Sequence, residues 1–149
     1  MDSIGDGELF ILLPIILLVF CLILVPVVFF ILTLRKALLR CAQQSRTMEP
    51  DHVWFLLIPF FNIVWQFIVV TRMSVSLANE YRRRNLPIEP EPGKTLGITF
   101  CVLNLCGWIP IIGIFTGIAG LVCWIVYWVK IAGFSEKLAM PYTPPAPVQ

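Results

Sequence analysis

The feature that most constrains this chain is an apolar run of 26 residues, Leu9–Leu34, which contains no charged side chain. As a helix the run would be about 39 Å long, against a hydrocarbon core of about 30 Å in a bilayer. It exceeds the core of a cleavable signal peptide, which has about 7–15 residues. No basic segment precedes it, and Arg35 and Lys36 follow it directly. The run therefore predicts an uncleaved transmembrane anchor.

The composition extends this prediction to the rest of the chain. Apolar residues make up 58% of the 149 residues and charged residues only 13%, whereas soluble domains have about 25% charged residues. So few charges cannot coat a globule of this size in water, and lipid must cover part of the surface. We expect one all-α integral membrane domain.

A second stretch, Thr95–Phe134, has 40 residues and a single charge, Lys130. One straight helix of that length would be about 60 Å long, twice the membrane thickness. The turn residues lie in the segment CGWIPIIG. They predict a transmembrane helical hairpin with arms from Thr95 to about Trp108 and from about Ile111 to Gly133, and with Trp108 at a membrane interface.

The stretch from His52 to Arg84 decides between three and four spans. Val53–Val70 has no charge but is interrupted by Pro59. After Pro59 the polar residues fall on one arc of a helical wheel, which predicts a long amphipathic helix. The arc consists of Asn62, Gln66, Arg72, Ser76, Asn79, Glu80, Arg83 and Arg84.

The distribution of positive charge favours a segment that enters the membrane and returns. Lys and Arg concentrate in cytoplasmic loops. If the segment turns back or lies along the interface, and the N-terminus is outside, all eleven basic residues lie on the cytoplasmic side. A full crossing would divide them four against seven. We therefore expect three full transmembrane helices plus a broken, re-entrant or interfacial amphipathic helix, with four transmembrane helices as the alternative.

This topology divides the chain into seven segments. The order is an acidic extracytoplasmic N-tail (1–8), the anchor (9–34), a cytoplasmic connection (35–51), the re-entrant amphipathic segment (52–84), a proline-rich loop (85–94), the hairpin (95–134) and a cytoplasmic proline-rich tail (135–149).

Three amides are the main intramembrane polar residues: Asn62, Gln66 and Asn104. Buried amides often hydrogen-bond between helices, and they can also line a solute path. Three glycines, Gly113, Gly117 and Gly120, lie early in the last helix. Small residues at this spacing allow helices to approach closely, either within the hairpin or at an oligomer interface.

Basic and aromatic residues predict contacts with the membrane surface. Arg82, Arg83 and Arg84 are expected to hold anionic head groups of the inner leaflet. Trp124 and Trp128, followed by Lys130, have the spacing of an interfacial belt.

Catalytic, metal and cofactor sites are not predicted. His52 is the only histidine, and no two of the five cysteines have the CxxC spacing of a metal or redox site. No nucleophile–base arrangement is visible, and there is no separate basic domain for nucleic acid. We expect a protein that is not an enzyme and does not bind nucleic acid.

Two segments, VWFLLIPFFNIVWQFIVVTRMSVSLANEYRRRN (53–85) and GIAGLVCWIVYWVKIAGFSEKLA (117–139), carry a resemblance. They resemble a family of small bacterial multi-pass membrane proteins of unknown function, with a W-x3-I-P-x2-N-x-V-W segment and a C-terminal YWVKIAG motif. The resemblance implies the bacterial inner membrane and no activity.

The expected function is that of a small accessory or scaffold subunit that packs with its own copies or with other integral membrane proteins. The alternatives are a small oligomeric channel or transporter that uses Asn62, Gln66 and Asn104, and a sensor of the lipid surface that acts through the amphipathic helix.

Overall fold

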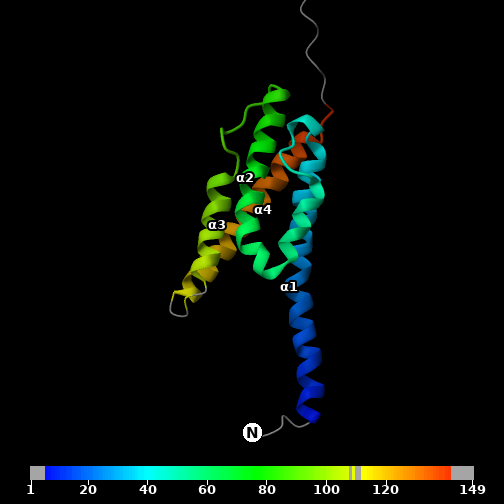
Figure 1. Ribbon diagram of the computed structural model, residues 1–149, viewed down its shortest axis with the longest axis vertical. Coiled ribbons are helices and arrows are strands. Elements are labelled where there is room, and N and C mark those ends of the chain that lie inside the picture. Colours follow the sequence, from blue (N-terminus) through cyan, green and yellow to red (C-terminus); the bar gives the residue numbers. More distant parts are fainter. Residues whose placement is uncertain (1–5, 108, 110–111, 142–149) are drawn as a thin grey trace, which may run out of the picture.

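A computed structural model of the chain describes residues 6–107, 109 and 112–141 and is all-α over these residues (Figure 1). The expected N-tail from residue 1 to 5, the tip of the hairpin at Trp108 and the end of the tail from residue 142 lie outside the described residues. The helices are α1 (Asp6–Arg40), the 3-10 helices η1 (Gln43–Ser45) and η2 (Pro50–Leu57), α2 (Pro59–Arg83), α3 (Lys94–Cys106) and α4 (Gly113–Leu138).

Three helices of the described chain are long and apolar enough to cross a membrane. They cover Glu8–Arg40, Phe60–Arg83 and Gly113–Leu138, and α3 is a shorter apolar helix of 13 residues. The predicted class, an all-α multi-pass membrane protein with three long helices and a further helical segment, is confirmed. The segment after Pro59 forms the expected long helix, of 25 residues, and the first arm of the hairpin is the shorter one, as expected. The helices long enough to span differ from the expectation, because α2 is among them and α3, the first arm of the hairpin, is not.

The segment from Pro50 to Arg83 runs into the body of the molecule and back again (Figure 1). The helix breaks at Ile58, whose backbone is extended, and Pro59 then occupies the first turn of α2, where a missing N–H is tolerated. Side chains hold η2 and α2 side by side: the indole Nε1 of Trp65 donates to the carbonyl oxygen of His52 at 2.9 Å, and Trp65 contacts the Phe55 ring edge-on. The break expected at Pro59–Phe61 is thus the turn between η2 and α2.

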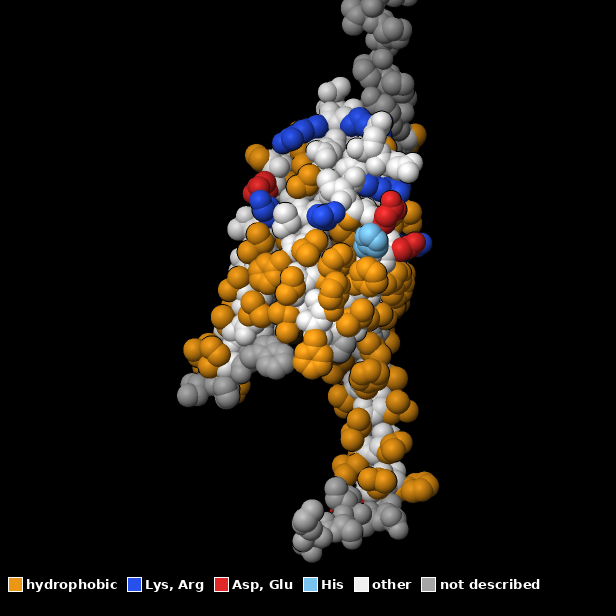
Figure 2. Space-filling model, viewed as in Figure 1, with side chains coloured by type: hydrophobic (Ala, Val, Ile, Leu, Met, Phe, Trp, Pro, Cys, Tyr) orange, Lys and Arg blue, Asp and Glu red, His pale blue; other side chains and the backbone are white. Residues whose placement is uncertain are grey.

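The buried core lies near the C-terminal end of α1. Ile31, Leu34 and Leu38 of α1 have no exposed surface, and neither have Leu77 of α2 and Ile131 of α4. The charged side chains visible in Figure 2 gather at this same end of the molecule, and apolar side chains cover the rest of that face. The fold therefore has a polar, well-packed end and an apolar end.

The polar face of α2 packs inward, which differs from the amphipathic helix expected at the membrane surface. Ser76 and Glu80 are buried. They bind the connection between α1 and η2: the backbone N–H of Ala42 donates to Glu80 Oε2 and that of Thr47 to Ser76 Oγ, both at 3.0 Å. The helical wheel grouped these residues correctly, but a polar connection rather than head groups lies opposite them.

Candidate binding pocket

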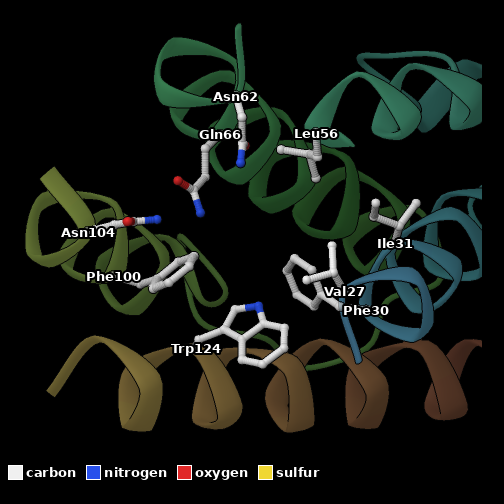
Figure 3. Close-up of a pocket in the computed structure, with 9 residues that line it drawn as sticks. All are labelled: Val27, Phe30, Ile31, Leu56, Asn62, Gln66, Phe100, Asn104 and Trp124. Atoms are coloured by element: carbon white, nitrogen blue, oxygen red, sulfur yellow. The ribbon is translucent and has the colours of Figure 1, made fainter. Parts of the chain in front are cut away.

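A pocket of about 220 Å³ lies between α1, η2, α2, α3 and α4 (Figure 3). Its lining combines the three predicted intramembrane amides with apolar and aromatic side chains. The lining residues are Val27, Phe30, Ile31, Leu56, Asn62, Gln66, Phe100, Asn104 and Trp124. The sequence identified the amides as one set, and the fold brings them to one cavity.

The amides come from two helices. Asn62 and Gln66 lie one turn apart on α2, and Asn104 lies on α3; in Figure 3 Asn62 and Gln66 lie across the pocket from Trp124, and Asn104 lies at the α3 side next to Phe100. Asn62 Oδ1 is buried and has no hydrogen-bond partner among the described residues. A buried acceptor without a donor costs about 1–3 kcal/mol. This oxygen has almost no accessible surface, and in Figure 3 the nitrogen of the Asn62 side chain points toward the cavity instead.

Aromatic rings from three helices complete the lining. Phe30 of α1 meets Trp124 of α4 edge-on at 5.4 Å between ring centroids, and Phe100 of α3 lies one turn before Asn104. Sequence reasoning treated the α1 segment as an anchor without ligand groups and missed its contribution. Its face of Val27, Phe30 and Ile31 has the i, i+3, i+4 spacing of one helix side, a signal that was present.

A second hollow of about 200 Å³ adjoins the first, since Phe100, Asn104 and Trp124 line both. It lies between α3 and α4 and is lined by Gly117 and Gly120, two of the three predicted packing glycines. A Cβ on Gly117 would meet nothing within 4 Å, whereas one on Gly120 would lie 3.6 Å from Leu103. Gly113 instead lies at the hairpin turn, where a Cβ would come within 2.7 Å of the Gly107 carbonyl oxygen.

Two of the three arginines expected to hold lipid head groups also have protein partners. Arg83 Nη2 and Arg84 Nε bind Glu80 Oε1 at 2.6 and 2.7 Å, and Arg84 also donates to the carbonyl oxygen of Leu138 at 2.9 Å. Arg82 is exposed. The cluster therefore helps to close the charged end of the bundle, and its binding of lipid stays a prediction.

The residues of the expected aromatic belt make internal contacts. Trp124 lines the pocket, and Trp128 donates from Nε1 to the Thr33 hydroxyl of α1 at 2.9 Å. Lys130 Nζ pairs with Glu89 of the loop before α3 at 2.8 Å. These side chains join α4 to its neighbours.

Side chains that commonly bind metals do not cluster in the part of the chain that the structure describes. No cluster of three or more His, Cys, Asp or Glu side chains is found there. Asp51 pairs with Arg35 at 2.7 Å, and the His52 ring stacks on Phe55. The adjacent Asp51 and His52 are thus engaged with different partners.

Comparison of the chain with protein-family models, with curated proteins and with solved structures found no match. The family resemblance of residues 53–85 and 117–139 therefore stays a prediction.

Proposed function

We propose that the chain is a non-enzymatic accessory or scaffold subunit of a membrane assembly. We place it in the bacterial inner membrane with the N-terminus outside, anionic lipid around its charged end, and further copies or other membrane proteins as partners. The resemblance and the charge distribution support the location and orientation.

The observation that carries this proposal is the N-terminal half of α1, which stands apart from the other helices (Figure 2). Every residue from Glu8 to Ile23 is exposed within the described structure. The turn at Ile58 ends partway along α1 and does not cover this half of the helix. At the apolar end, α1 and the α3–α4 hairpin point away from each other (Figure 1). A partner helix packed in this space would contact α1, the hairpin and the turn at Ile58 together.

Site-specific photo-crosslinking tests the proposal in native membranes. A photoreactive amino acid at Leu13 of α1 should give discrete protein adducts, identified by mass spectrometry, if a partner helix covers this arm. The same group at Val129 of α4 is the matched control, because both positions are apolar and similarly exposed, 63% and 67%. If Leu13 gives only the lipid adducts that Val129 gives, the subunit proposal is wrong.

Cys21 gives a direct test for a second copy as the partner. It is a free, exposed cysteine in the separate half of α1. Mild oxidation should produce a disulfide-linked dimer if two α1 helices pack together at this level, and Cys21→Ser should remove the dimer. A native pull-down with mass identification distinguishes a hetero-partner.

A second candidate, a small channel or transporter, is supported by the convergence of Asn62, Gln66 and Asn104 on one pocket. It predicts solute flux in proteoliposomes that Asn104→Leu reduces. Absence of flux for a panel of ions and small neutral solutes would remove the support for this candidate.

A further inference from the structure

We infer that the amide-lined pocket binds a flat, neutral ring that carries carbonyl oxygens and a hydrocarbon tail, which is the chemistry of a membrane quinone. The inference does not depend on the subunit role, since the pocket is built from the chain's own residues. Four properties of the site select this class of ligand: the direction of the amide nitrogens, the aromatic rings, the uncharged lining and the hollow beside the pocket.

The amide nitrogens select a hydrogen-bond acceptor. Figure 3 shows the nitrogen of Asn62 pointing toward the cavity, and those of Gln66 and Asn104 on the cavity side of their side chains. None of the three nitrogens has a hydrogen-bond partner among the described residues. Amide N–H groups only donate, and a carbonyl oxygen can accept two such bonds while it brings no donor of its own. A carbonyl compound therefore matches the polar side of the pocket.

The aromatic side chains select a flat ring. Phe30 of α1, Phe100 of α3 and Trp124 of α4 line the same pocket. Aromatic rings attract one another in stacked or edge-on arrangements, beyond the gain from burial. A carbonyl group on a flexible chain would use the amides but would gain nothing specific from these rings. A ring that holds carbonyl oxygens in its own plane uses both parts of the lining.

The charge and the depth of the pocket select a neutral compound from the membrane. None of the residues that line the pocket is charged, and a buried ion without a partner is unfavourable. Phe30 lies five residues before Arg35 in α1, which is about 8 Å along the helix. The pocket thus lies just inside the apolar layer, below the charged end, where a compound dissolved in the membrane reaches it.

The adjoining hollow has room for the hydrocarbon tail. It has a volume of about 200 Å³ and shares Phe100, Asn104 and Trp124 with the amide pocket. Gly117 and Gly120 line it, and no side chain projects from either glycine. The amide pocket of about 220 Å³ therefore takes the ring, and the hollow takes the first part of the tail.

Photo-crosslinking in nanodiscs tests the inference. Three probes carry the same diazirine on the same hydrocarbon tail. The first is a fully substituted benzoquinone, which does not add to thiols; the second is the corresponding alkylbenzene without the carbonyl oxygens; the third is a methyl ester, which has a carbonyl group and no ring. We expect the quinone to label residues of α3 and α4 around the two hollows about threefold or more above either of the other probes. Mass spectrometry locates the adducts.

Variants of the lining test the two halves of the argument. Gln66→Leu removes one donor and should lower quinone labelling about three- to tenfold, the equivalent of one hydrogen bond, while labelling by the alkylbenzene stays the same. The fold should be retained, because the Gln66 side chain has no hydrogen-bond partner among the described residues. Val27→Phe, which fills the pocket, should also lower quinone labelling; Val25→Phe is its matched control, since Val25 is on the same helix and 53% exposed.

Three outcomes would overturn the inference. Equal labelling by the quinone and the alkylbenzene would show that the amides do not select a carbonyl oxygen. Equal labelling by the quinone and the ester would show that the aromatic side chains do not select a ring. Quinone labelling that neither Gln66→Leu nor Val27→Phe lowers would place the quinone outside the pocket.

Discussion

At the scale of single residues, the most constrained charge is Glu80. Its carboxylate has no exposed surface and binds Arg83, Arg84 and the backbone N–H of Ala42. Removing one member of a buried ion pair costs about 3–5 kcal/mol, because the remaining charges lose their partner. We expect Glu80→Ala to lower the free energy of unfolding by about this amount, measured by denaturant titration in detergent micelles.

Glu89 provides the control for Glu80, because its pair with Lys130 is solvent-exposed, with side-chain exposures of 60% and 30%. Exposed pairs contribute about 0–1 kcal/mol. Equal losses for Glu80→Ala and Glu89→Ala would contradict the idea that Glu80 holds the charged end together.

The thiol of Cys41 should be unreactive in the folded protein. Burial, reinforced by the negative charge of Glu80, raises its pKa from 9.0 to about 12. A rise of this size lowers the thiolate fraction at pH 8 about a thousandfold, and the thiolate is the nucleophile. With the other four cysteines replaced, maleimide alkylation should be very slow between pH 7 and 9 and complete after unfolding in SDS. A Gln44→Cys variant that also lacks Cys41 is the exposed control; comparable rates at the two positions would show that Cys41 is accessible.

At the scale of helices, Gly97 controls how closely α3 approaches α2 and α4. A Cβ at Gly97 would clash with Val70 of α2, lying 2.9 Å from its Cγ2, and would lie 3.1 Å from Tyr127 Cε2 of α4. Overpacking of this kind costs about 1–3 kcal/mol. Gly97→Ala should therefore destabilise the protein, and a second substitution, Val70→Ala, should restore part of the loss. Gly117→Ala is the matched control: it has open space and gains helix propensity, so it should be neutral or stabilising by up to about 1 kcal/mol.

The sequence predicted helices better than it predicted which side of each helix faces inward. Composition and length identified the apolar helices, and Pro59 correctly marked the break, because proline and chain length act locally. The inward polar face of α2 was missed because the periodicity of one helix does not identify its neighbour. For the same reason the sequence did not predict Gly97 as a helix-packing residue, although it predicted Gly113, Gly117 and Gly120. The intramembrane amides could be predicted, because Asn62 and Asn104 are polar residues within uncharged apolar stretches. The contribution of Phe30 to the pocket could not, because it depends on how α1 packs against the other helices.

At the scale of the whole molecule, one end is fastened by polar contacts and the other end is open. At the closed end, Arg40 Nη1 donates to Ser135 Oγ and the Tyr81 hydroxyl donates to the Phe134 carbonyl oxygen, both at 2.9 Å, so α1 and α2 are tied to α4. At the apolar end α1 stands alone (Figure 2). The contacts that stabilise the fold thus lie at the charged end, which the distribution of Lys and Arg predicts to be cytoplasmic. The apolar end is left to contact lipid or a partner.

The turn between η2 and α2 makes a topological prediction for the whole molecule. Because η2 enters the body and α2 returns, the connection near Gln44 and the loop near Pro90 should be on the same side of the membrane. Both positions are exposed, and Asn85 is a poor labelling site because its φ of 54° is left-handed and unfavourable for cysteine. Gln44→Cys and Pro90→Cys, in a chain without other cysteines, should react with an impermeant maleimide only from the cytoplasmic side. Labelling of the two positions from opposite sides would establish four crossings and rule out the re-entrant arrangement; labelling of both from the outside would keep it and reverse the orientation.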